Sequence, residues 1–363
     1  MSSRASHRSP LAPHRPGAGV ILQSTRLDER IEPVASRSAR EGRARGIAYA
    51  LVSAVLFGGA TPFVRPALDR VDPIAGAGWL YLGHALFLST MAITARAAGR
   101  RREEPLGRGD LGPLIAGIVA GGLVAPGAFL SGLALVPAHR ASLLLGLEIV
   151  FTLVLAIVFR KERLGPRGWA GAAMLIVAGI LVSAPAGSGT AARGAGEAGM
   201  LAAGSSEAGL AAVGAFLIVV ACLGWAVDNN VTASISGKDP TVISLLKGWA
   251  GALAYLGLGG LFGRTLAAPP RDLLTILLAG AIGYGLSLRL FIFALRHIGA
   301  ALTATIFSTA PIAGFALSVV LLGETPAPAG WAAFAVAGIG VAIVATDGRS
   351  PGLTMEPGTG PRT

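Results

Sequence analysis

Charged side chains are scarce in this chain of 363 residues. Asp, Glu, Lys and Arg together make up 13% of it, whereas hydrophobic residues make up 53%, and the mean hydropathy is +0.66. A soluble protein of this length needs far more charge to cover its surface, so the composition excludes an ordinary soluble domain. Apolar runs of about 20 residues, long enough to cross ~30 Å of hydrocarbon as helices, recur along the chain. The sequence therefore predicts an all-α integral membrane protein.

Cysteine and histidine are also rare, and this limits the chemistry of the chain. Cys222 is the single cysteine, which excludes an intramolecular disulfide framework. The five histidines are scattered, and neither an HExxH cluster nor a nucleophile with a matched base is present. The glycine-rich stretch "GAGEAG" at 194–199 follows no strand, and there is no ATP-binding loop. We therefore expect no catalytic residue, no metal and no cofactor, and any transport to be secondary.

Acidic residues are outnumbered by basic ones, and the net charge of +11 raises the question of nucleic-acid binding. The distribution of the basic residues indicates a different origin. If the N-terminus lies inside, 22 Lys and Arg residues fall in the tails and loops on one side of the membrane and six on the other. Because basic residues gather on the cytoplasmic side, both termini are predicted to be cytoplasmic, in a bacterial inner membrane. Nucleic acid is not an expected partner.

Ten apolar segments follow one another along the chain. They cover approximately 46–64, 74–95, 111–135, 138–159, 168–183, 210–231, 241–261, 273–294, 301–322 and 328–345. The remaining parts are polar or rich in small residues. We expect a disordered, Arg-rich cytoplasmic tail over 1–45, a flexible linker over 184–209 and a second cytoplasmic tail over 346–363.

The two groups of five segments, 46–183 and 210–345, resemble each other. At a shift of 162 residues Glu162 falls on Glu324 and Trp169 on Trp331, and the first hairpins of the two groups match at a shift of 167. Five crossings are an odd number, so the second group would enter the membrane upside down relative to the first. Such inverted repeats are typical of transporters, in which two bundles rock about a site near the midplane. The predicted fold is ten transmembrane helices in two inverted five-helix repeats around a central cavity.

Several segments carry a resemblance to a known family. The stretch "GAALTATIFSTAPIAGFALSVVLLGETPAPAGWAAFAVAGIGVAI" resembles the second half of EamA-type transporters of the drug/metabolite transporter superfamily, and "ASLLLGLEIVFTLVLAIVFRKERLGPRGWAGAAMLIVAGILV" is similar to the corresponding part of the first half. The resemblance covers about 46–345. It implies export or exchange of small metabolites through a central cavity. This chain departs from the pattern at Ile149, which replaces the proline found at Pro311, and at Arg65, His84 and Arg289.

One carboxylate lies in the middle of an apolar segment. Glu148 is near the centre of 138–159, where a charge costs about 2.5–3.5 kcal/mol by insertion scales. We expect it to face the bundle interior, either as a proton or substrate-amine site or as a hydrogen bond between packed helices. His84 lies at a similar depth in its own segment, and the two could form a proton relay or a static pair.

A second polar group is placed by hairpin geometry. Asp228 and Lys247 are each about nine residues from the centre of the loop that joins their helices, so they reach the same depth. We predict an ion pair with a structural or gating role, direct substrate contact being the alternative. Asn229 and Asn230 follow Asp228, and one of them is expected to point into the cavity.

The eighth segment contributes Tyr284 and Ser287, with cavity lining and glycine-mediated packing as the two interpretations. Pro126 and Pro311 are predicted helix kinks, because proline removes a backbone hydrogen bond. Gly117 and Gly121 form a GxxxG pattern that indicates helix packing.

Taken together, the sequence predicts a non-enzymatic secondary transporter that exports or exchanges small amphipathic metabolites such as amino acids or amines, by alternating access and with proton coupling as an option. A channel or a sensory scaffold is the alternative, and an intramembrane enzyme is favoured least. The expected partners are a small-molecule substrate and membrane lipids, and a homodimer is left open.

Overall fold

The computed structural model describes residues 18–99, 103–160, 165–183 and 197–345. The described part divides into two units at residue 45. Before that boundary the chain is already helical, since α1 (Ala18–Val64) begins at Ala18. The structure thus has a helix over 18–45, where the sequence analysis predicted a disordered tail, and residues 1–17 lie outside the described residues. Low hydrophobicity indicates that a segment has little to pack against. It does not prevent Ala, Leu, Glu and Arg, which favour helix, from forming one.

The helices of the second unit follow the predicted segments, with interruptions. In the first half they are η1 (Arg65–Asp69), α2 (Pro73–Ala97), η2 (Arg108–Asp110), α3 (Leu111–Gly117), η3 (Ile118–Val124), α4 (Ala125–Leu133), α5 (Ala138–Leu144), α6 (Leu147–Arg160) and α7 (Pro166–Ser183). In the second half they are α8 (Glu197–Ser234), α9 (Pro240–Leu261), α10 (Pro270–Ala279), η4 (Gly280–Leu286), α11 (Ser287–Phe307), α12 (Ala310–Leu322) and α13 (Pro328–Ala345).

Two predicted boundaries differ from the structure. The linker expected over 184–209 is helical from Glu197, where α8 begins, and its earlier part lies outside the described residues. The loop expected between the eighth and ninth segments is also helical, because α11 continues from Ser287 to Phe307. In the first stretch four of the residues 197–209 are alanine, the best helix former, so a composition of small residues does not by itself predict a loop. The second stretch, 295–300, is polar at Arg296 and His297 but contains no proline, so the helix can continue through it.

Eight helices within the described ranges are long and apolar enough to cross a membrane. Two shorter apolar helices, Pro166–Val182 and Pro328–Ile343, occupy the positions of the fifth and tenth predicted segments. The chain is thus a multi-pass, all-helical membrane protein, and the described part contains no strand.

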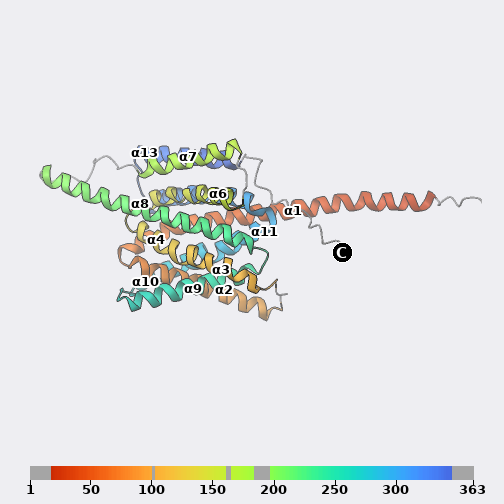
Figure 1. The fold of residues 1–363 in the computed structure, drawn as a ribbon, viewed down its shortest axis with the longest axis horizontal. Coiled ribbons are helices and arrows are strands. Elements are labelled where there is room, and N and C mark those ends of the chain that lie inside the picture. Colours follow the sequence, from red (N-terminus) through yellow and green to blue (C-terminus); the bar gives the residue numbers. More distant parts are fainter. Residues whose placement is uncertain (1–17, 100–102, 161–164, 184–196, 346–363) are drawn as a thin grey trace, which may run out of the picture. The chain divides into compact units, whose positions relative to one another are not determined.

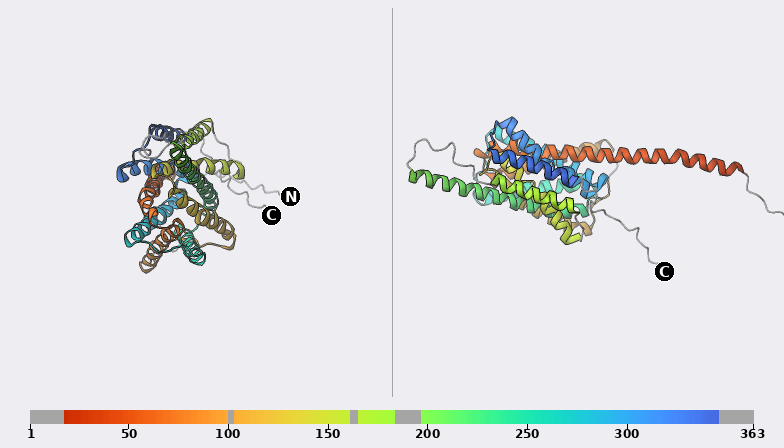
Figure 2. Two further views of the ribbon diagram at one scale, coloured as in Figure 1. Left: turned by 90° about the vertical axis from the view of Figure 1, so that its left-hand side faces the viewer. Right: turned by 90° about the horizontal axis from the view of Figure 1, so that it is seen from above.

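Helices from the two halves pack in matched pairs within the bundle that follows residue 45. α7 lies against α13, and α2 lies against α9. α5 packs on α12. The halves are also in contact through α4 and α8, which are not equivalent helices. Figure 1 shows α7 and α13 together at one edge of this bundle, with α2, α9 and α10 gathered at the other. The end-on view in Figure 2 shows that helices of both halves surround the middle of the bundle.

The two halves also interrupt their helices at matching places. The π-helical turns η3 and η4 start at Ile118 and Gly280, which are separated by 162 residues, the same shift that aligns Trp169 with Trp331. A second interruption separates α5 from α6 at 145–146 and α11 from α12 at 308–309. Pro126 and Pro311 are each the second residue of the helix that follows such an interruption. Both prolines thus lie directly after a break in regular α-helix, and the predicted kinks stay predictions.

The N-termini of α2 and α9 are built in the same way. Asp72 accepts hydrogen bonds from the backbone N–H groups of Ile74 and Ala75, at 2.9 and 3.3 Å. Asp239 does so for Thr241 and Val242, at 2.8 and 3.3 Å. In both helices a proline follows the capping aspartate, where its missing N–H costs nothing. This shared Asp-Pro start explains the sequence match at a shift of 167.

Candidate functional site

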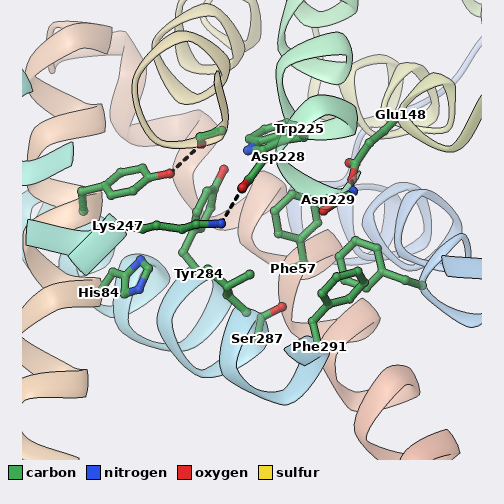
Figure 3. A pocket seen from close by; sticks show the side chains of 14 residues that line it. Phe57, His84, Glu148, Trp225, Asp228, Asn229, Lys247, Tyr284, Ser287 and Phe291 are labelled. Carbon is green, nitrogen blue, oxygen red and sulfur yellow. Dashed lines mark hydrogen bonds and ion pairs between the residues drawn. The ribbon is translucent and has the colours of Figure 1, made fainter. Parts of the chain in front are cut away.

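A pocket lies inside the bundle, between helices of both halves (Figure 3). Seven of the eight predicted site residues meet there or line it. They are His84, Glu148, Asp228, Asn229, Lys247, Tyr284 and Ser287. They come from α2, α6, α8, α9, η4 and α11, so no single helix carries the site. Figure 3 shows Glu148 and Asn229 on one side of the pocket, His84 on the other, and the Asp228–Lys247 pair between them.

The predicted ion pair between Asp228 and Lys247 is confirmed. Lys247 Nζ donates to Asp228 Oδ1 at 2.5 Å and to the hydroxyl of Thr232 at 2.6 Å. The Thr232 hydroxyl in turn donates to Asp228 Oδ1 at 2.9 Å. Asp228 is 7% exposed and Lys247 is 2% exposed. Both charges are thus neutralised within the bundle, as equal distances from the hairpin loop predicted.

The helical segment formed by α3 and η3 approaches the Asp228–Lys247 pair closely, because glycine has no side chain at the two contact positions. A Cβ on Gly117 would lie 2.6 Å from Asp228 Oδ1. A Cβ on Gly121 would lie 2.5 Å from both Cβ and Cγ of Asp228. The GxxxG pattern therefore packs a helix directly against a buried ion pair. The sequence indicated helix packing at these glycines, but it did not indicate that they pack against the Asp228–Lys247 ion pair.

Glu148 lies in the first turn of α6, directly after the interruption at 145–146. It is 6% exposed. Its Oε1 accepts a hydrogen bond from Asn229 Nδ2 at 2.7 Å, and no ion pair with it occurs among the described residues. Asn230 points elsewhere and donates to the backbone carbonyls of Ala226 and Thr152, at 2.9 and 3.3 Å. Of the two asparagines, Asn229 is the one that lines the pocket.

His84 does not pair with Glu148, so the predicted relay between these two residues is wrong as a direct contact. Its Nε2 lies 3.0 Å from the hydroxyl of Ser244 on the neighbouring α9. Its Nδ1 is buried and has no hydrogen-bond partner within the described structure. Similar depth in two segments does not fix which way each helix is rotated. In this bundle the rotation turns His84 toward α9 and Glu148 toward α8.

Tyr284 and Ser287 both line the pocket, at the end of η4 and the start of α11. Ser287 makes a reciprocal pair with Ser53 of α1. Each hydroxyl donates to the other residue's backbone carbonyl, at 2.8 and 2.9 Å. Ser287 therefore ties α11 to α1 below the pocket, while Tyr284 belongs to its aromatic wall.

The sequence analysis missed that aromatic wall. Six rings gather around the pocket, with centroid distances of 4.9 to 6.5 Å between neighbours. They belong to Phe57, Tyr81, Trp225, Tyr284, Phe291 and Phe307. Aromatic residues make up only 6% of the chain, so their recurrence within a few residues of the intramembrane polar groups was an available signal. Trp225, three residues before Asp228, is the clearest case.

Two tyrosines support the π-helical turn η3. The Tyr81 hydroxyl donates to the carbonyl of Gly121 at 3.0 Å. The Tyr255 hydroxyl donates to the carbonyl of Leu123 and accepts the N–H of Gly127 at 2.7 Å. A π-helical turn followed by proline leaves backbone groups without their usual partners. These hydroxyls replace those partners, so the irregular helix is tolerated inside the bundle.

The comparisons with known proteins bear on the whole of this bundle. The model of the EamA-like transporter family matches residues 44–184 and again residues 212–346. The chain belongs to the EamA-like transporter family. The two matches coincide with the two halves that share the π-helical turns. The pocket therefore lies between the two EamA repeats of a membrane transporter.

The individual proteins that match this chain share less than a quarter of their aligned residues with it. An uncharacterized transporter from Methanothermobacter thermautotrophicus is 23% identical over 283 residues, which cover 76% of this chain and 78% of the relative. A crystal structure of another protein superposes with a TM-score of 0.60 at 17% identity, covering 84% of this chain and 98% of the other. The first relative is named as a transporter, and the second shows that the fold occurs in a solved structure.

Ion pairs close both ends of the EamA bundle. At one end, called the Arg70 end, Arg70 forms two hydrogen bonds of 2.7 Å to Asp272, and this contact raises the pKa of Arg70 above its usual value. At the other, called the Lys238 end, Lys238 pairs with Glu104 and lies 3.8 Å from Asp110. Asp110 and Asp272 are 162 residues apart, so they occupy corresponding positions. Asp272 is in tight contact with Arg70, whereas Asp110 lies farther from Lys238, whose close partner is Glu104.

Glu324, in the loop before α13, caps a helix of the other repeat. Its carboxylate accepts the N–H groups of Ala138 and His139 at 2.9 and 2.8 Å, and His139 Nδ1 at 2.7 Å. Partial burial acts to raise the pKa of Glu324, but the hydrogen bonds from His139 and Ala138 outweigh it and hold the pKa below its usual value. A carboxylate at a helix N-terminus also interacts favourably with the helix dipole.

Proposed function

We propose that this protein is a secondary transporter that exports or exchanges small amphipathic metabolites, with amino acids and amines as the first candidates. The observation that carries the proposal is Glu148: a buried carboxylate with no cationic partner in the described structure, facing a pocket between two EamA repeats. Such a group inside a membrane is costly. Moving a substrate past it would account for its presence.

Alternating access is the proposed mechanism, with the two repeats inverted and ten helices crossing the membrane. The paired packing of α2 with α9, α5 with α12 and α7 with α13 supports an axis that exchanges the halves. Corresponding ion pairs at the Arg70 end and the Lys238 end support two gates that open in turn. The distribution of basic residues supports cytoplasmic termini in a bacterial inner membrane, with the Lys238 end facing inward.

Proton coupling at Glu148 is part of the proposal. A buried carboxylate without a cation is stabilised either by a proton or by a cationic group of the substrate. Competition between the two for one carboxylate would make inward movement of a proton drive outward movement of the substrate. The Asp228–Lys247 pair has a different role, holding α8 and α9 together beside the pocket.

The test compares metabolites in the culture medium of cells that express the wild type, Glu148→Gln or Glu207→Gln at equal membrane abundance. Glu207 is an exposed carboxylate in α8 and serves as the matched control. A compound enriched by the wild type and Glu207→Gln, and absent with Glu148→Gln, supports export through Glu148. Equal enrichment by all three removes Glu148 from the mechanism. If no compound is enriched by any of them, the proposed export is contradicted.

A further inference from the structure

The charges that line the pocket do not cancel. Four of its residues can carry charge: His84, Glu148, Asp228 and Lys247. Asp228 and Lys247 neutralise each other in direct contact. His84 has one ring nitrogen in contact with Ser244 and lines the same pocket as the buried Lys247, and burial beside a cation favours a neutral imidazole. An ionised Glu148 is then the only uncompensated charge among the lining residues, and it is negative.

The surface beside Glu148 consists mostly of aromatic rings. Phe57 and Phe307 line both the main pocket and a smaller adjoining one, and Glu148 also lines both. Phe57 is in contact with Trp225, Tyr284 and Phe307, at centroid distances of 5.4 to 5.5 Å. Ring faces attract cations, most strongly where water is excluded. A carboxylate next to a box of aromatic rings is therefore suited to an ammonium group.

The same arrangement is unfavourable to a carboxylate on the substrate. Lys247 is the cation that would have to bind it, and its ammonium group already donates to Asp228 and Thr232. A substrate carboxylate would also approach the Asp228 carboxylate in a buried place, which is strongly unfavourable. His84 Nδ1 is a further buried atom without a partner in the described structure, and as a neutral acceptor it could receive an N–H of the substrate.

We infer that the pocket selects organic monocations, that is, amines or quaternary ammonium compounds with an apolar or aromatic body, over zwitterionic amino acids and anions. The inference rests on the proposed transport function and narrows its substrate class. Glu148 supplies the counter-charge, and Phe57, Trp225, Tyr284 and Phe307 supply the aromatic box. Asp228 and Lys247 form an ion pair with each other, so neither is available to bind a second charged group of the substrate.

The test uses three probes that share one phenethyl body and differ in charge: phenethylamine, phenylalanine and 3-phenylpropionate. Binding to the purified full-length protein is measured by calorimetry at neutral pH. We expect phenethylamine to bind the tightest and the anion not to bind. Glu148→Gln is expected to weaken phenethylamine binding about tenfold or more. This variant keeps an oxygen that can accept the Asn229 hydrogen bond, so the local structure is retained.

Two leucine variants on one helix provide a matched control. Phe57→Leu removes a ring of the box and is expected to weaken phenethylamine binding several-fold. Phe63→Leu makes the same change two turns along α1, where the ring is 53% exposed on the outside of the bundle, and it should leave binding unchanged. The unfolding temperature of each variant in detergent shows whether it is folded, so weakened binding in a folded protein can be assigned to the pocket.

Failure of this inference can be told apart from failure of the proposed function by a flux assay in proteoliposomes loaded with a metabolite extract. Tighter binding of phenylalanine than of phenethylamine, or unchanged amine binding by Glu148→Gln, overturns the inference. Protein-dependent flux of neutral or anionic compounds without any amine overturns it as well and leaves transport standing. Amine binding that depends on Glu148, without flux of any compound, supports the inference and contradicts the proposed transport.

Discussion

The two halves of the bundle share their backbone irregularities but not their buried polar groups. The π-helical turns η3 and η4 and the interruptions before α6 and α12 recur at nearly the same shift. At these shifts, however, Asp228 corresponds to Thr61 and Lys247 to Leu80. Glu148 corresponds to Ala310, and His84 corresponds to Gly251. Each charged group of the pocket is therefore unique to one half.

The difference separates what the fold needs from what the site needs. Bends that occur twice belong to the scaffold, because both halves must follow the same path around the middle of the bundle. Residues that occur once are not required by this shared path, since the other half follows it without them. Thr61 and Leu80 are both buried, so the bundle can pack at this position without any charge. The ion pair, Glu148 and His84 are thus the residues to examine for function.

The largest effect is expected when the ion pair is broken on one side. Lys247→Leu copies the first half at that position and leaves Asp228 charged and buried without a cationic partner. We expect a loss of about 3–5 kcal/mol in the free energy of unfolding. Denaturation in detergent, followed by circular dichroism, measures it.

The double variant Asp228→Thr, Lys247→Leu copies both residues of the first half. It removes the charges together, so it should be clearly more stable than Lys247→Leu alone. A double variant as unstable as the single one would show that the two halves are packed differently here and would break the comparison.

A smaller effect is expected from adding a methyl group to the glycine face of η3. Gly121→Ala places Cβ against Asp228, and overpacking of this kind costs about 1–3 kcal/mol. Gly112→Ala on α3 is the matched control, because nothing lies within 4 Å of its added Cβ. It should be neutral or stabilising by up to ~1 kcal/mol. Equal unfolding temperatures for the two variants would contradict close packing at Gly121.

The sequence was sufficient for the parts that depend on distance along the chain. The Asp228–Lys247 pair follows from equal spacing about a hairpin, and Pro126 and Pro311 each mark a break in regular α-helix. It was insufficient where helix rotation decides. His84 and Glu148 lie at similar positions within their segments, but His84 contacts Ser244 and Glu148 contacts Asn229. Spacing along the chain does not predict these partners.

The aromatic box also could not be predicted from spacing along the chain. Its rings come from α1, α8, η4 and α11, so it exists only after these helices have packed. The helical state of 18–45 was missed for a different reason. Composition predicts whether a segment has enough apolar surface to pack into a core, whereas helix formation depends on the helix propensity of its residues.

A change of about 1 kcal/mol is expected at Glu324, the carboxylate that caps α5. Glu324→Gln weakens the hydrogen bonds to Ala138 and His139, and loss of a cap typically costs about that much. Because the pKa of Glu324 in the folded state is below its usual value near 4.5, its contribution is fully present above pH 4.5. It is lost as the pH falls through the folded-state pKa.

The wild type and Glu324→Gln should therefore differ in unfolding temperature near neutral pH and converge in acid. Glu207→Gln, at an exposed carboxylate, provides the baseline for general acid effects. A difference that grows with acidification would contradict the role assigned to Glu324.

The smallest effects are expected at the two ends of the bundle. Arg70→Gln removes the two hydrogen bonds to the buried Asp272, and Lys238→Gln removes the contacts with the exposed Glu104 and with Asp110. Each pair has one exposed partner, Arg70 or Glu104, so solvent and salt screen both pairs and limit their contribution to stability. We expect slight decreases in unfolding temperature at low salt, larger for Arg70→Gln, and none at high salt. A larger decrease for Lys238→Gln would reverse the comparison between the two ends.

The single thiol of the chain has a practical consequence for following motion. Cys222 is fully buried in α8, and its Sγ lies 3.5 Å from the carbonyl of Leu144. Water-soluble maleimides should therefore find almost nothing to label in the natural protein. If a cysteine is introduced at the Arg70 end or the Lys238 end, its rate of maleimide labelling would measure the exposure of that position, because Cys222 adds almost no labelling of its own. The chain is in this sense already prepared for site-directed labelling, and the opening of each end could be timed in the otherwise unaltered protein.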